Sequence, residues 1–225
     1  MNRKPTKKKL ISICIPVLNE EQNIKNLYSE LQILARKLSN RFNFEFIFTD
    51  NNSTDLTWKL IKEISTSDSR VRGFRFTRNI GFQQSIYFNY MQAKGDAVVQ
   101  IDADLQDPPS VIIDFLKGWA SGFKVVVGIR RERHENFFLI RFRKFGYSFL
   151  SRAARFRITQ NAGDFRLIDR EVVEILRKSK NPHPYLRGAI AGLGFPEKEV
   201  IYDRRMRNAG KSKIGFIAII KLGFT

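Results

Sequence analysis

Three aspartates within six positions, Asp102, Asp104 and Asp107, are the densest group of side chains in the sequence that could bind a metal ion. They follow residues 97–101, a short apolar run that is typical of a buried strand. A buried strand that ends in acids delivers carboxylates to the edge of a sheet, where open α/β sheets bind their ligands. Mg²⁺ and Mn²⁺ take oxygen ligands and keep positions open for a diphosphate. The pattern therefore suggests a metal site, with solvated loop acids or helix caps as the alternative for an isolated Asp-x-Asp pair.

Alternating strands and helices lead up to this acidic segment and continue beyond it. The expected strands are residues 10–16, 44–49, 71–76, 97–101 and 124–129, with a later one at 198–202. The expected helices are residues 21–38, a segment around 58–64, and residues 83–93 and 111–120. This alternation predicts an α/β fold with a mainly parallel central sheet, right-handed crossovers and flanking helices.

Polar clusters follow four of the expected strands. They are Asn19-Glu20, residues 50–55, Arg78-Asn79 and residues 102–107. Because the carboxyl ends of parallel strands meet at one edge, these clusters should gather there, which is hard to explain as unrelated solvated loops. The G-x-G-x-x-G, Walker A and G-x-S-x-G motifs are absent, so we expect neither a Rossmann dehydrogenase, a P-loop NTPase nor a nucleophile-elbow hydrolase.

Composition narrows the class of protein and of partner. The chain has 225 residues, 43% of them hydrophobic, which suits one large domain or one domain with a small appendage. A single cysteine, Cys14, excludes a disulfide framework and fits a reducing compartment, and its apolar surroundings predict a buried residue. His134 and His183 lack metal-binding spacing and are interpreted as structural or surface residues. The net charge of +18 calls for an anionic partner: nucleic acid, a membrane face or phosphorylated substrates.

The second half of the chain is basic and aromatic. Residues 130–157 interleave Arg and Lys with Phe and Tyr, which predicts either a helix with solvated arginines or a surface at a membrane interface. Nucleic acid is not expected, because no standard recognition motif is present. Residues 204–213 combine five cations with a glycine and a serine, as in a loop that closes over phosphates or an exposed basic loop. Residues 1–9 form a basic tail without a signal peptide, and no apolar window is long enough to span a bilayer.

The sequence resembles family 2 glycosyltransferases of the GT-A fold, and within them the polyprenyl-phosphate glycosyltransferases of the dolichol-phosphate mannose synthase and bactoprenol glucosyltransferase type. Six segments carry the resemblance in the family's order: I-P-V-L-N-E-E (15–21), T-D-N-N-S-T-D (49–55), R-N-I-G-F (78–82), D-A-D-L-Q-D-P-P (102–109), G-D-F-R-L-I-D-R (163–170) and R-N-A-G-K-S-K (207–213). Each is weak alone, but the ordered set spans nearly the whole chain. The resemblance implies a domain at 10–213, with a nucleotide-sugar half at 10–129 and an acceptor half at 130–213.

The resemblance also implies roles for individual residues. The donor nucleotide sugar would be bound by Pro16, Leu18, Glu20, Asp50, Arg78, Gly81, Asp102, Ala103 and Asp104. Mg²⁺ or Mn²⁺ would be held by Asp102, Asp104 and Gln106, and the catalytic set would be Asp104, Asp164 and Arg166. The acceptor phosphate would meet Arg130, Arg141, Arg143, Ser148, Arg207, Ser212 and Lys213.

The implied reaction is inverting transfer of a sugar from a UDP- or GDP-sugar to a polyprenyl phosphate at the cytoplasmic membrane face. A phosphate acceptor is already anionic, whereas a glycan hydroxyl, the alternative acceptor, needs a base, for which Asp164 is the candidate. A basic binding module without catalysis is the remaining alternative, and assembly into a homo-oligomer is left open. The family often has two adjacent acids where this chain has Asp50-Asn51, so the nucleotide base is open. Bactoprenol relatives continue into two transmembrane helices, so residues 214–225 are expected to begin a membrane-approaching amphipathic helix of a truncated or soluble form.

Overall fold

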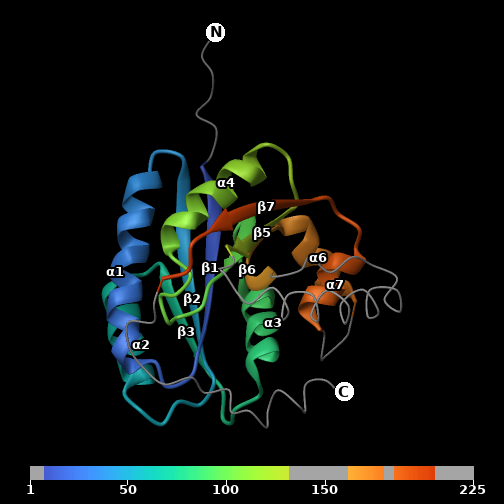
Figure 1. Cartoon of the computed structure of the whole chain (residues 1–225). Coiled ribbons are helices and arrows are strands. Elements are labelled where there is room, and N and C mark those ends of the chain that lie inside the picture. The colour runs from blue at the N-terminus through green and yellow to red at the C-terminus, as the bar shows by residue number, and fades with distance from the viewer. Residues whose placement is uncertain (1–7, 132–161, 180–184, 206–225) are drawn as a thin grey trace, which may run out of the picture.

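Seven strands form one central sheet in the computed structural model, which describes residues 8–131, 162–179 and 185–205 (Figure 1). The strands are β1 (Lys9–Val17), β2 (Phe42–Asp50), β3 (Val71–Arg75), β4 (Ala97–Gln100), β5 (Val125–Arg130), β6 (Ala162–Asp169) and β7 (Glu197–Tyr202). Their spatial order is β3-β2-β1-β4-β6-β5-β7. Only β6 runs antiparallel to its neighbours, so the predicted mainly parallel sheet is confirmed.

Helices cover both faces of this sheet. They are α1 (Glu21–Leu38), α2 (Thr57–Ser67), α3 (Phe82–Gln92), the 3₁₀ turn η1 (Pro109–Val111), α4 (Ile112–Ala120), α6 (Arg170–Lys178) and α7 (Leu186–Gly192). Buried side chains of α1, α2 and α4 share one hydrophobic cluster, and those of α3, α6 and α7 share another. The described part is therefore a three-layer α/β/α arrangement, with the sheet in the middle (Figure 1).

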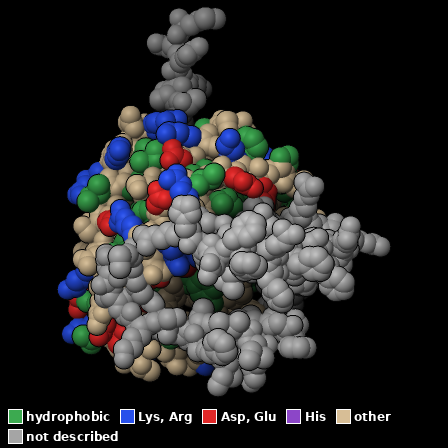
Figure 2. Space-filling model, viewed as in Figure 1, with side chains coloured by type: hydrophobic (Ala, Val, Ile, Leu, Met, Phe, Trp, Pro, Cys, Tyr) green, Lys and Arg blue, Asp and Glu red, His purple; other side chains and the backbone are tan. Residues whose placement is uncertain are grey.

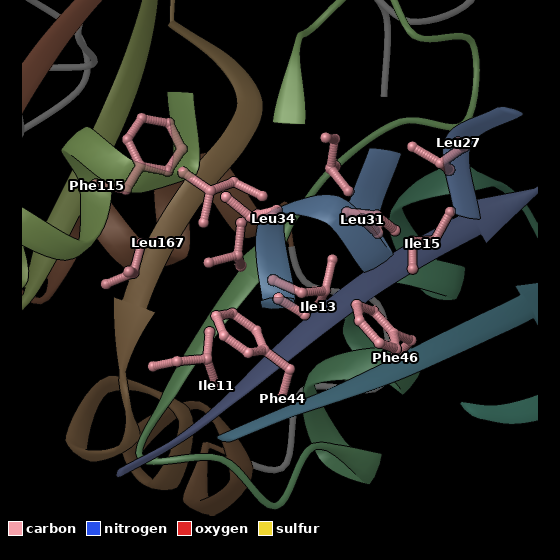
Figure 3. Packing of buried hydrophobic residues seen from close by; sticks show 14 of the residues in the cluster. Ile11, Ile13, Ile15, Leu27, Leu31, Leu34, Phe44, Phe46, Phe115 and Leu167 are labelled. Carbon is pink, nitrogen blue, oxygen red and sulfur yellow. The ribbon is translucent and has the colours of Figure 1, made fainter. Parts of the chain in front are cut away.

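The larger cluster shows how sequence periodicity builds the fold. Strand β1 alternates, so that Ile11, Ile13 and Ile15 point toward α1, as Figure 3 shows. Helix α1 packs against this face of β1 through an apolar stripe, in which Leu27 and Leu31 are fully buried. Cutting a buried leucine in such a core back to alanine costs about 2–5 kcal/mol. The other face of β1 carries Cys14, which is buried as expected, and burial raises the pKa of its thiol.

Strand β6 is the main element that the sequence pattern did not predict. Its alternating positions include Asp164 and Arg166, and charged residues in a strand suggest a loop when burial is unknown. Both are nonetheless buried, with 7% and 4% of their surface exposed, because β6 inserts between β4 and β5. Helix α7 was also not predicted, whereas the strands at 10–16, 44–49, 71–76, 97–101, 124–129 and 198–202 are each found within two residues of the expected bounds.

The surface of the described part gives no sign of a membrane span. None of the helices in the described ranges combines the length and apolar character needed to cross a bilayer. Lys and Arg side chains lie at several separate places on the face shown in Figure 2, between apolar and acidic ones. Most of the basic segment 130–157 lies outside the described residues, and so do all of residues 214–225.

Candidate functional site

Loops that follow β1, β2 and β3 are hydrogen-bonded to one another at the carboxyl edge of the sheet. The backbone N–H of Asn19 donates to the Ser53 hydroxyl at 2.8 Å, and that of Thr54 donates to Oδ1 of Asn19 at 2.7 Å. Asn51 accepts a hydrogen bond from the Ile80 N–H at 2.9 Å. The expected gathering of the polar clusters along one edge is therefore confirmed for these three loops.

Asp50 is the most deeply buried acid of this edge, with no exposed surface. Its Oδ1 accepts from the Ser53 N–H at 3.0 Å, and its Oδ2 lies 3.2 Å from Nε of Arg75. The latter contact is an ion pair that falls outside hydrogen-bond geometry, so Oδ2 keeps hydrogen-bonding capacity within the described part of the protein. A buried carboxylate with an unused lone pair at a sheet edge fits the donor-binding role predicted for Asp50.

The other residues predicted on the donor side lie around the same edge. Pro16 is buried near the end of β1, whereas Leu18 and Glu20 are half-buried in the loop that follows. The Glu20 carboxylate accepts from Nδ2 of Asn23 at 2.7 Å, at the start of α1. Arg78 is exposed, and Gly81 has φ +94° at the start of α3, a conformation that L side chains rarely adopt.

The acidic loop after β4 is anchored by its apolar residues. Ala103 and Leu105 are buried, while Asp102, Asp104 and Gln106 are half-buried between them. Leu105 is held with φ +59°, which reverses the chain so that the Gln106 N–H donates to Oδ1 of Asp104 at 3.1 Å. The turn thus holds the three predicted metal ligands within one short loop, between side chains that are buried.

The surroundings of Asp102 raise the pKa of its carboxyl group. Burial, together with the nearby carboxylates of Asp107, Asp104 and Asp164, raises its pKa to about 7, although a hydrogen bond from Nε2 of Gln100 at 2.9 Å opposes the shift. Neither Asp102 nor Asp104 has an arginine or lysine partner within the described ranges. Acids without a cationic partner fit a divalent cation, which would remove their mutual repulsion.

The protein alone does not complete a metal site in the described part. No group of three or more His, Cys, Asp or Glu side chains there has an arrangement that could hold a metal ion. The predicted set of two carboxylates and one amide fits a metal whose remaining ligands come from a diphosphate or water.

Asp107, the third aspartate of the acidic segment that suggested a metal site, is instead paired with protein side chains. It is 1% exposed and accepts from the Tyr202 hydroxyl at 2.6 Å and from Nη2 of Arg130 at 3.0 Å. Nε of Arg204 lies 3.6 Å from the same carboxylate. Burial raises the pKa of the Tyr202 phenol, so it stays a neutral donor. Asp107 thus ties the acidic loop to the ends of β5 and β7.

The loop after β7 is bound to the acidic loop through its backbone. The Arg205 N–H donates to the Gln106 carbonyl at 2.9 Å, and the Arg205 side chain donates to Glu30 of α1 at 2.7 Å. The basic segment 204–213 therefore begins directly beside the predicted metal ligands. Its predicted acceptor residues Arg207, Ser212 and Lys213 lie outside the described residues, as do Arg141, Arg143 and Ser148.

On strand β6, Asp164 is held by two side chains. Nε and Nη2 of Arg187 donate to its two oxygens at 2.9 and 2.8 Å, and Nε2 of Gln83 donates at 3.2 Å. Burial would raise the pKa of Asp164, but the hydrogen bonds and charge of Arg187 outweigh it, and the pKa is lowered. Arg166, two residues further on, donates to the Gly163 carbonyl at 3.0 Å. Arg187 and Gln83 are partners that the sequence motifs did not reveal.

This ion pair predicts a pH-dependent contribution to stability. Replacing Arg187 with glutamine should lower the free energy of unfolding by about 1–2 kcal/mol at pH 7, a value reduced because Arg187 is partly exposed. The folded pKa of Asp164 is lowered, so the pair's contribution is full above about pH 5 and is lost as pH falls through that lowered pKa. Urea unfolding of both proteins between pH 7 and pH 3 should show the difference narrowing on acidification. A difference that stays constant over this range would contradict the assignment.

Comparison with known proteins identifies the class. The family model for Glycosyl transferase family 2 matches residues 12–176, and the chain belongs to this family of glycosyltransferases. It is 36% identical over 212 residues to the uncharacterized glycosyltransferase YkcC of Bacillus subtilis strain 168, covering 94% of this chain and 65% of that protein. It is 33% identical over 204 residues to the bactoprenol glucosyl transferase of Shigella phage SfV, covering 90% of this chain and 66% of that protein. The chain thus spans just under two thirds of the length of these relatives.

Solved structures support the GT-A fold. One is the mannosyltransferase PcManGT of Pyrobaculum calidifontis in complex with GDP-Man and Mn²⁺, with a TM-score of 0.57, 19% identity and coverage of 91% of this chain and 59% of that one. Another is the glucosyl-3-phosphoglycerate synthase of Mycobacterium tuberculosis in complex with Mn²⁺, UDP and glucosyl-3-phosphoglycerate, with a TM-score of 0.55, 21% identity and coverage of 96% and 75%. At these identities the likeness shows the fold alone.

Proposed function

We propose that this chain transfers a sugar, with inversion, from a nucleotide-diphosphate sugar to a polyprenyl phosphate at the cytoplasmic face of the membrane. The observation that carries the proposal is the division of charge along the carboxyl edge. Asp102 and Asp104 have no cationic partner among the described residues, whereas the nearby Asp107 and Asp164 are each paired with arginine. The part of the edge around Asp102 and Asp104 suits a metal-bound diphosphate, and the part around the arginine-paired acids suits an anionic acceptor.

On the donor side, Asp50 and the loop around Gly81 would bind the nucleotide. Asp102, Asp104 and Gln106 would hold Mg²⁺ or Mn²⁺, which as a Lewis acid neutralises charge that develops on the departing diphosphate. Arg204 and Arg205, whose loop is hydrogen-bonded to Gln106, would lead the basic segment toward the same phosphates.

On the acceptor side, the state of Asp164 favours a phosphate over a hydroxyl. A hydroxyl acceptor needs a base that takes its proton, but a carboxylate whose pKa is lowered by Arg187 is a poor proton acceptor. A phosphate monoester is ionised at neutral pH, its second pKa being about 6, and needs no strong base. Asp164 and Arg166 would then orient the sugar and the acceptor, and their charges would stabilise the transition state.

Relatives support the same acceptor and cofactor. The Shigella phage relative is named as a bactoprenol glucosyl transferase, which supports a polyprenyl phosphate. The solved neighbours carry Mn²⁺ with UDP or GDP-Man, which supports a divalent metal and a nucleotide sugar. A lipid acceptor would bring the protein to a membrane surface, where the excess of Lys and Arg in the chain favours anionic lipids.

The test is a transfer assay with a matched pair of acceptors. The protein is incubated with UDP-glucose or GDP-mannose, Mn²⁺, and either a short-chain polyprenyl phosphate or the same polyprenol without phosphate. We expect a lipid-linked sugar only with the phosphorylated lipid, its loss on addition of EDTA, and its return with excess Mn²⁺ or Mg²⁺. Transfer to a glycan hydroxyl but not to the lipid phosphate would overturn the proposal, as would undiminished transfer in EDTA.

A further inference from the structure

Arg187 uses only one edge of its guanidinium group to hold Asp164. The bonds come from Nε at 2.9 Å and Nη2 at 2.8 Å. A guanidinium carries five N–H donors in a plane, so both donors of Nη1 and one of Nη2 remain on its other edge. No described residue accepts a hydrogen bond from that edge, and 35% of the side chain is exposed. Arg187 can therefore bind a second anion without releasing Asp164.

Arg130 is a second arginine whose guanidinium is held by a buried acid, with Nη2 donating to Asp107 at 3.0 Å and Nε donating to the Tyr202 hydroxyl at 3.4 Å. Its side chain is 32% exposed. A Cβ atom built on Gly163 would lie 3.2 Å from Nη2 of Arg130, and Gly163 is the neighbour of Asp164 in the chain. The charge of Arg130 is also felt at Arg187, where it opposes the rise in pKa that Asp164 causes. Two partly exposed guanidinium groups thus lie near the same short stretch of β6.

More arginines than these two surround the carboxylates of Asp107 and Asp164. Nε of Arg204 lies 3.6 Å from Asp107, and the charge of Arg166 helps to lower the pKa of Asp164. The phosphate of a monoester is anionic, and its oxygens suit the remaining N–H edges of a guanidinium.

We propose that Arg187 binds the acceptor phosphate together with Arg130, as a further arginine of the acceptor site. This inference rests on the proposed function and names a residue that the family motifs leave unassigned. Each guanidinium would be fixed by a buried carboxylate on one edge and present its other edge to the phosphate. Because the donor diphosphate is assigned to the acidic loop, loss of Arg187 should weaken acceptor binding and spare donor binding.

The experiment compares Arg187→Gln and Arg187→Lys with Arg70→Gln. Arg70 is a matched control, because its Nε and Nη2 also hold a carboxylate, that of Asp68, but at the opposite edge of the sheet just before β3. For Arg187→Gln we expect the KM for short-chain polyprenyl phosphate to rise about tenfold or more. The Kd for the nucleoside diphosphate with Mn²⁺ should stay within about twofold. Arg187→Lys keeps the charge but loses the planar fork of N–H donors. Its KM for polyprenyl phosphate should therefore lie between those of the wild type and Arg187→Gln.

Direct binding of the same short-chain polyprenyl phosphate, measured in detergent without donor, makes the result independent of turnover. Weaker binding by Arg187→Gln than by the wild type and Arg70→Gln supports the inference, even if no sugar is transferred and the proposed function fails. Equal binding by all three proteins overturns the inference, even if the wild type transfers sugar. A parallel loss of acceptor and nucleotide affinity would also overturn it, since Arg187 would then only maintain the fold.

Discussion

Replacing Asp104 with asparagine should lower kcat/KM for sugar transfer by about a thousandfold, equivalent to about 4 kcal/mol of transition-state stabilisation. Asparagine keeps an oxygen that can accept the hydrogen bond from the Gln106 N–H, so the turn should persist. What is lost is the negative charge that the proposed metal site needs. Transfer to polyprenyl phosphate is measured over a range of Mn²⁺ concentrations, with thermal unfolding as the check on the fold.

Asp114→Asn is the control for this change. Asp114 is an exposed acid of α4 that pairs with Lys117 at 2.7 Å and is assigned no role in binding, so its replacement should leave transfer within about twofold of the wild type. If Asp104→Asn retains more than about a tenth of wild-type activity at saturating Mn²⁺, Asp104 does not hold the metal on which transfer depends.

Replacing Asp107 with alanine should produce the second large effect, on stability. The change leaves Arg130 without its buried partner and the Tyr202 hydroxyl without its acceptor. We expect a loss of about 2–3 kcal/mol in the free energy of unfolding, or about 4–12 °C in Tm. Chemical and thermal unfolding of the purified variant measure both quantities.

The matched variant for Asp107→Ala is Tyr202→Phe, which removes one hydrogen bond and keeps the carboxylate. Its cost should be about 1 kcal/mol. If the two variants lose the same small amount of stability, the Asp107 carboxylate does not hold the acidic loop to β5 and β7. The donor KM should rise in Asp107→Ala more than in Tyr202→Phe, because the acidic loop loses its tie to both β5 and β7.

The parallel half of the fold could be read from local patterns. Strands β1, β4 and β5 are short, mainly apolar runs, and the amphipathic stripes of α1 and α4 have the spacing of helices that cover a sheet. Burial on both sides makes such strands continuously apolar, so the signal lies within the segment itself. The position of Asp50, Asp102 and Asp104 at the carboxyl edge could also be predicted, because each comes at or just after the end of a strand in a parallel sheet.

Strand β6 and its partners could not be read in this way. Asp164 and Arg166 are buried in the sheet, and Asp164 is neutralised there by Arg187 and hydrogen-bonded by Gln83. Arg187 lies 23 residues after Asp164 in the chain, and Gln83 lies 81 residues before it. A sequence pattern records the types of neighbours along the chain, whereas these contacts depend on where α3 and α7 pack.

The sequence by itself determined the class of fold, the family and the segment that carries the predicted metal ligands, because periodicity and motifs are local properties. Only the tertiary structure decided which charges neutralise one another. It paired Asp107 with Arg130 and Tyr202, paired Asp164 with Arg187, and left Asp102 and Asp104 without a cationic partner in the described ranges. The ionic state of a carboxylate depends on burial and on charges a few ångströms away, and those distances are fixed by packing between elements far apart in the chain.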